Sequence, residues 1–406
     1  MKVSKSWLVG LALLGAGPVH AQVSDDVVKI GVMNDQSGVY EDITGMKAVE
    51  AAKMAVEDFG GTVLGKRIEI VPANHQNKTD IASGIARKWI DTEQVDAIAD
   101  VTGSGIALAV NEVTREKNRV MIAASAATSD LTGKACSPTT VQFSYDTYAL
   151  AKSTGTETLK QGGDTWFFLT ADYAFGHALE RDTSKFVEQG GGKVLGAVRA
   201  PLGTTDYSSF LLQAQASKAK IIGLATAGGD TITAIKQAAE FGIQRGGQRL
   251  GGLLIYINDV EALGLQAAQG LVLTTSFYWD VSDETRAWTK RFLDRTGGKR
   301  PPNMLQAGLY SGVLHYLKAV KAAGTDEAKA VSAKMREIPV NDFYNKDVVI
   351  RKDGRVLHDM YLAQVKSPQE SKGKFDDYKI LSKLAGKDAY RPESEGNCPL
   401  VTGAAK

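Results

Sequence analysis

Residues 27–33, VVKIGVM, and residues 45–59, GMKAVEAAKMAVEDF, decide the fold that this sequence predicts. The first segment is a short apolar run rich in β-branched residues, which is typical of a buried strand. The second places alanines at positions 48, 51, 52 and 55, the spacing of one face of a helix, and Thr44 can cap its start. A strand followed by a helix predicts an α/β unit with a mainly parallel sheet.

The same alternation continues along the chain. Further strands are predicted at 67–71, 97–101 and 120–124, with helices at 80–92 and 106–115. The pattern restarts after Tyr145, with strands at 165–170, 221–226, 253–257 and 271–277 and helices at 175–188, 207–216, 231–241, 284–293 and 303–323. Residues 351–355 are predicted to turn between two strands, 346–350 and 356–365. A chain of 406 residues with two such series predicts two domains.

The N-terminus reads MKVSKSWLVGLALLGAGPVHAQ. Lys2 and Lys5 form a basic start, residues 7–16 are apolar, and small residues lead up to Ala21. This pattern is typical of a cleaved signal peptide, because a membrane-spanning helix needs about 20 apolar residues. The sequence therefore predicts a signal peptide over 1–21 and a mature protein in the periplasm.

Charge and cysteine content restrict the partners of the mature chain. The sequence has 48 basic and 46 acidic residues, interspersed along its length, so no basic stripe predicts binding to nucleic acid. Cys136 and Cys398 are the only cysteines, an even pair in a chain with an export signal. We expect them to form one disulfide; the alternative is two buried thiols.

Motifs for catalysis are missing or incomplete in the sequence. Residues 60–67, GGTVLGKR, approach a phosphate-binding loop, but Arg67 stands where a serine or threonine must bind magnesium. The histidines of the mature chain are scattered, with no pair at metal-ligand spacing. We therefore expect no enzyme activity, no cofactor and no metal; an exported hydrolase is the alternative from another class.

Two small polar loops follow consecutive predicted strands. Residues 102–105 read TGSG and residues 125–129 read SAATS. Ligands of open α/β sheets bind beyond the carboxyl ends of the strands, where helix N-termini attract anions. The pair of loops predicts a carboxylate site.

The chain resembles the periplasmic substrate-binding proteins of ABC transporters, of the leucine/isoleucine/valine-binding type. The residues that carry the resemblance are IGV at 30–32, SG at 37–38, AAKMAV at 51–56, DYAFG at 172–176 and the segment 306–318. The resemblance implies a type I fold with two lobes, three crossovers and a hinge. Lobe one would contain 22–145 and 277–350, and lobe two 146–276 and 351–406 with the C-terminal tail.

The resemblance also implies a ligand site between the lobes. In this family the loops that carry Gly103, Ser104, Ser125, Ala126, Ala127 and Thr128 hold the ligand carboxylate. Tyr40, Tyr148 and Phe175 lie in segments that reach the cleft. Partners would be a small carboxylate and the permease subunits of an importer, and we expect a monomer.

Two departures from the family pattern bear on the ligand. Asn258 occupies the position of the acidic residue that pairs with an amino-acid ammonium, and Asp259 follows it. Gly228 and Gly229 replace an aromatic residue. Together with SFYW at 276–279, which includes Phe277, this pattern resembles the subgroup that binds aromatic carboxylates. The alternative is a branched-chain or other hydrophobic amino acid, with Asp259 as the ammonium partner.

The signal peptide generates the first prediction. Mature protein recovered from its native host should begin at Gln22, as measured by intact mass and N-terminal sequencing. An uncleaved N-terminus on protein recovered from the cytoplasm would refute this prediction.

Overall fold

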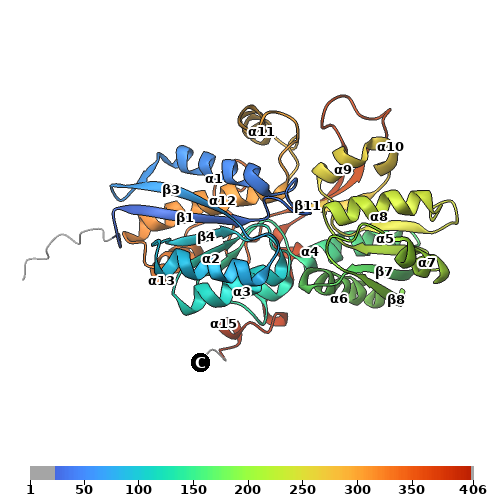
Figure 1. Ribbon diagram of the computed structural model, residues 1–406, viewed down its shortest axis with the longest axis horizontal. Helices are drawn as coiled ribbons and strands as arrows, with labels where there is room; N and C mark the ends of the chain where they lie inside the picture. Colours follow the sequence, from blue (N-terminus) through green and yellow to red (C-terminus); the bar gives the residue numbers. More distant parts are fainter. Residues whose placement is uncertain (1–22, 404–406) are drawn as a thin grey trace, which may run out of the picture.

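The computed structural model describes residues 23–403, so the predicted signal peptide and its cleavage site lie outside the described residues. Figure 1 shows two α/β halves side by side, each with a sheet and its own helices. The chain passes between the halves at 143–146, 276–282 and 338–359, which gives the three crossovers of the predicted fold. The lobe boundaries given above stay a prediction.

The first half contains a six-stranded sheet in the order β2-β3-β1-β4-β5-β6, parallel except for β2. Its strands are β1 Val27–Asn34, β2 Thr62–Val63, β3 Lys66–Asn74, β4 Ala97–Asp100, β5 Val120–Ala123 and β6 Thr140–Gln142. One face packs on α1 Gly45–Phe59, α12 Met304–Ala323 and α13 Ala328–Glu337. The other face packs on α2 Thr79–Asp91 and α3 Ser104–Glu116. Helix α11, Asp283–Thr296, lies against α1.

The second half contains a four-stranded parallel sheet in the order β10-β9-β7-β8. Its strands are β7 Thr165–Ala171, β8 Lys193–Ala200, β9 Ile221–Ala225 and β10 Arg249–Gly252. Its helices are α4 Thr147–Leu150, α5 Thr156–Lys160, α6 Ala174–Gln189, α7 Ser208–Ala216, α8 Gly229–Glu240, α9 Ile257–Leu263 and α10 Leu265–Ala268. A third, antiparallel sheet of β11 Val272–Thr275, β12 Met360–Val365 and β13 Tyr378–Leu384 packs on the same core.

Several expectations from the sequence are wrong in detail. The strand expected at 253–257 lies earlier, at β10, and Leu253–Tyr256 is a buried loop that leads into α9. The hairpin around 351–355 is reduced to isolated bridges, including Ile350 with Val356. Thr44 precedes α1, but its hydroxyl donates backward to the main chain of Asp35 and Tyr40 instead of capping the helix. Strand β8 and helix α13 were not foreseen.

The predicted disulfide between Cys136 and Cys398 is confirmed, and it joins cysteines 262 residues apart. It ties the C-terminal helix α15, Pro399–Thr402, to the loop that precedes β6. Beside it, Arg391 donates to the carbonyl of Ser129 at 2.8 Å, while Glu395 pairs with Lys185 of α6 at 3.4 Å. The tail was predicted with lobe two, but its end contacts both halves.

The disulfide generates the second prediction. The double variant Cys136→Ser/Cys398→Ser should lose about 2–5 kcal/mol of unfolding free energy, because the unfolded chain gains the freedom of a long open loop. Urea denaturation followed by tryptophan fluorescence measures this difference. An unchanged midpoint and slope would show that the tail contacts alone hold the C-terminus.

Candidate functional site

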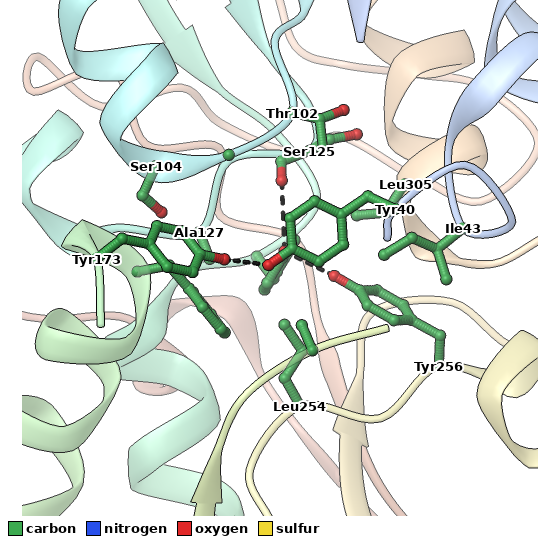
Figure 2. Close-up of a pocket in the computed structure, with 14 residues that line it drawn as sticks. Tyr40, Ile43, Thr102, Ser104, Ser125, Ala127, Tyr173, Leu254, Tyr256 and Leu305 are labelled. Atoms are coloured by element: carbon green, nitrogen blue, oxygen red, sulfur yellow. Dashed lines mark hydrogen bonds between the residues drawn. The ribbon is translucent and has the colours of Figure 1, made fainter. Parts of the chain in front are cut away.

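A small cavity lies where the loops after β4 and β5 face the second half (Figure 2). It is lined by Tyr40, Ile43, Thr102, Gly103, Ser104, Ser125, Ala127, Tyr145, Tyr173, Phe175, Ala227, Leu254, Tyr256 and Leu305. The volume open to the centre of a water molecule is about 20 Å³. That is room for about one water molecule, so a ring-sized ligand needs the side chains or the halves to separate.

The loop after β4 presents hydrogen-bond donors to the cavity. Asp100 and Val101 both have left-handed backbone, with φ of 74° and 53°, which is strained for a β-branched valine. This turn leads through Thr102 to the N-terminus of α3, whose first N–H groups have no intrahelical acceptor. The Thr102 hydroxyl is buried without a hydrogen-bond partner. The Ser104 Oγ accepts from the N–H of Thr128 at 3.1 Å, so its own proton is free to donate.

Side-chain hydrogen bonds with Asp100 and Gln142 hold the loop after β5 in place. The Ser125 hydroxyl donates to the carboxylate of Asp100, whose other oxygen accepts from Asn34 Nδ2 at 2.9 Å. Gln142 Nε2 donates to the carbonyls of Ala126 and Thr128 at 2.9 and 3.2 Å. These bonds occupy the carbonyls of Ala126 and Thr128, and neither residue lines the cavity.

Two pairs of tyrosine hydroxyls lie at the cavity. Tyr40 of the first half pairs with Tyr173 of the second (Figure 2). Tyr145, within the crossover at 143–146, pairs with Tyr256 of the second half at 2.8 Å. Burial raises the pKa of Tyr40 and of Tyr256 well above its usual value, so both phenols stay protonated. The four hydroxyls are paired with one another in this arrangement, and each keeps a lone pair that can accept from a ligand.

Six of the predicted residues line this cavity: Tyr40, Gly103, Ser104, Ser125, Ala127 and Phe175. Ala126, Thr128, Tyr148, Gly229, Asn258 and Phe277 do not. Thr102 lies in the predicted loop 102–105, whereas sequence reasoning missed Tyr145, Tyr173, Leu254 and Tyr256 among others. Tyr173 lies within the DYAFG motif, and Tyr256 lies two residues before Asn258. These two motifs are the features of the sequence from which Tyr173 and Tyr256 could have been predicted as site residues.

Tyr148 and Phe277 lie in aromatic packing instead of in the cavity. The Tyr148 ring meets Phe186 of α6 edge to face, with centroids 5.0 Å apart. The Phe277 ring packs against Trp288 and Phe343, with centroids 5.9 and 6.0 Å away. Both segments lie near crossovers, but their side chains point into the cores beside them.

The side-chain amide of Asn258 takes part in a buried hydrogen-bond network that joins the halves. Its Oδ1 accepts from Asn303 Nδ2 at 2.6 Å, and its Nδ2 donates to the carbonyls of Asp42 and Pro301, both at 3.4 Å. Asp259 accepts from the N–H of Tyr256 at 2.9 Å at the start of α9, and burial raises the pKa of Asp259 to about 7. Neither residue lines the cavity, whose described lining contains no charged side chain.

The glycines at 228 and 229 touch the opposite half directly. The N–H of Gly229 donates to the carbonyl of Val39 at 3.2 Å. A Cβ on Gly228 would lie 2.8 Å from that carbonyl oxygen and 3.1 Å from the Tyr40 ring. The missing side chains therefore allow close contact between the halves.

This contact generates the third prediction. Gly228→Ala should hold the halves apart, because overpacking of about 1–3 kcal/mol disfavours the closed arrangement. Small-angle X-ray scattering should show a larger radius of gyration than for wild type. Gly264→Ala is the control, since Gly264 also has positive φ but has nothing within 4 Å of a Cβ. Equal radii for both variants would contradict the prediction.

Within residues 23–403, no group of three or more histidine, cysteine or acidic side chains is arranged to hold a metal ion. No helix in the same part of the chain is long and apolar enough to cross a membrane.

Comparisons with known proteins agree with the fold. A periplasmic binding protein from Burkholderia mallei is 52% identical, with a TM-score of 0.90, over 92% of this chain and 99% of that one. A branched-chain amino acid ABC transporter periplasmic ligand-binding protein from Burkholderia xenovorans is 38% identical, with a TM-score of 0.81 and the same coverage. A solute-binding protein from Rhodopseudomonas palustris, in complex with benzoate, shares the fold at 22% identity, with a TM-score of 0.78 over 88% and 96% of the two chains.

The family model for periplasmic binding proteins matches residues 27–374, most of the chain. The extent of that match and the structural likeness confirm the type I fold and the role in solute binding for ABC transport. The chain belongs to the periplasmic binding protein family.

Proposed function

We propose that this receptor binds a small carboxylate with an aromatic ring in the cavity between its halves and delivers it to the permease of an ABC importer, acting as a monomer. The observation that carries the ligand class is the absence of charged side chains from the described lining. The proposed carboxylate contacts are the hydroxyls of Thr102 and Ser104, the N-terminus of α3 and the Ser125 loop.

A zwitterionic amino acid would bring an ammonium into this lining. An ammonium buried without a partner costs several kcal/mol. By its sequence position Asp259 would pair with the ammonium, but its carboxylate accepts from the N–H of Tyr256 at the start of its own helix, α9. A ligand without an ammonium avoids this cost.

The remaining lining suits a ring. Tyr40, Tyr173 and Phe175 contribute aromatic rings to the lining, with the Tyr173 and Phe175 centroids 5.9 Å apart. Leu254 and Leu305 add apolar surface. Aromatic pairs favour offset or edge contacts at such separations, and the phenol hydroxyls can pair with ring substituents.

A hydrophobic amino acid is the second candidate. The branched-chain amino acid name of the Burkholderia xenovorans protein, at 38% identity, favours it. One structural feature also favours an amino acid. The carboxylate of Asp100 is hydrogen-bonded to Ser125 and supplies a negative charge near the cavity. The two candidates differ in one chemical group, the ammonium.

The fourth prediction compares ligands that differ only in this group. 3-Phenylpropanoate should raise the melting temperature by several degrees at saturating concentration, while phenylalanine should do little, since bound ligand adds about 3 kcal/mol at a hundred times Kd. The pair of 4-methylpentanoate and leucine tests the same difference without a ring. Stronger stabilisation by phenylalanine or leucine than by its deaminated partner would overturn the aromatic carboxylate assignment.

Ser104→Leu is the matched change in the protein. The larger side chain would fill the space at the N-terminus of α3, so it should abolish the thermal shift with 3-phenylpropanoate. Ser208→Leu, at the start of α7 outside the cavity lining, should leave that shift unchanged. Equal shifts for both variants would place the ligand elsewhere.

A further inference from the structure

Asp100 is a fully buried carboxylate at the end of β4, directly behind the proposed carboxylate loops. Its backbone has left-handed geometry, and its carbonyl accepts from the N–H groups of Ala124 and Ser125, both at 3.1 Å. Its side chain accepts from Ser125 and Asn34. Asp100 therefore fixes both the main chain and the hydroxyl of the second loop.

The hydrogen bond between Ser125 and Asp100 sets the direction in which Ser125 can act. A serine hydroxyl has one proton, and an ionised carboxylate can only accept. While Asp100 is ionised, Ser125 gives its proton to Asp100 and presents only lone pairs to the cavity. A ligand carboxylate is also only an acceptor, so it cannot bond to Ser125 in that state.

Among residues 23–403, no cationic side chain hydrogen-bonds to Asp100 or lowers its pKa. Asn34 Nδ2 divides its donation between Asp100 and the carbonyl of Gly45, both at 2.9 Å. Burial raises the pKa of the nearby Tyr145 hydroxyl, and the negative charge of Asp100 raises it further. The neighbouring Asp35 carboxylate accepts from the N–H groups of Gly38 and Tyr40, at 2.8 and 3.0 Å.

Burial raises the pKa of Asp100 to about 6, and the hydrogen bonds from Ser125 and Asn34 lower it only in part. A second negative charge within about 4–6 Å raises the pKa of a carboxyl further. An anionic ligand at Ser125 would supply such a charge. Protonation of Asp100 near neutral pH is then favoured by the ligand itself.

We propose that Asp100 is a positioning residue that takes up a proton when an anionic ligand binds. The proton comes from solvent, Asp100 then donates to Ser125 Oγ, and Ser125 turns its own proton to the ligand carboxylate. No covalent bond other than the O–H bonds changes, and the net charge of the complex equals that of the free protein. The inference rests on the proposed function, because it requires a carboxylate at Ser125.

The consequence is a pH-dependent affinity. Between the pKa of free Asp100, about 6, and the higher pKa that Asp100 has in the complex, 3-phenylpropanoate binding should weaken by up to about tenfold per pH unit, as uptake of up to one proton requires. Below that pKa, Asp100 is already protonated in the free protein, so the affinity should be constant until the ligand itself is protonated. The neutral 3-phenylpropanamide should show no such slope.

Isothermal titration calorimetry in phosphate and in Tris buffer at the same pH measures the uptake directly. At pH 7.5 we expect wild type to take up between about half and one proton per bound 3-phenylpropanoate. Asp100→Asn, which keeps an acceptor for Ser125, should take up none and should bind with a flat pH profile. Asp96→Asn is the matched control, because burial also raises the pKa of Asp96, to about 7. Asp96 lies before the other end of β4, away from the proposed ligand, so this variant should behave as wild type.

Binding without proton uptake in wild type, or uptake that persists in Asp100→Asn, would overturn the role of Asp100 and leave the proposed function standing. If Asp100→Asn does not fold, the pH profile of wild type with the acid and with the amide decides alone. Failure of 3-phenylpropanoate to bind at any pH from 5 to 8 would overturn the proposed function, and the inference with it.

Discussion

The carboxyl ends of parallel strands share one edge of a sheet, and the candidate site depends on this constraint. In the first half, β4 and β5 end side by side, so their following loops meet at one place. In the second half, β7, β9 and β10 end at the opposing edge and deliver Tyr173, Ala227 and Tyr256. Neither edge forms the cavity alone. The site exists only because three crossovers hold the two edges face to face.

A few polar contacts bridge these edges: two tyrosine pairs, the network of Asn258 with Asn303, and the bond from Gly229 to Val39. An intramolecular hydrogen bond contributes about 0.5–1.5 kcal/mol net. The sum is a few kcal/mol, comparable with what a ligand adds by binding one arrangement of the halves better than another. These polar contacts are therefore weak enough for a small ligand to compete with.

The alternation of elements could be predicted from sequence because buried strands and amphipathic helices differ in period. The two loops at 102–105 and 125–129 were also predictable, since the parallel order fixes where they meet. The identity of the facing side chains was not. Leu253 and Leu254 were assigned to a strand because an apolar run indicates burial; they are buried, but in the loop that leads into α9. Asn258 matched an acidic position in the chain order, yet the start of α9 turns it toward Asn303.

The account's central claim is that the cavity takes an acid without an ammonium. Mass spectrometry of the small molecule released by denaturing protein purified from its native host tests this claim most directly. The account predicts a carboxylic acid with an aromatic ring and no amine. Release of leucine, isoleucine, valine or another amino acid would contradict it.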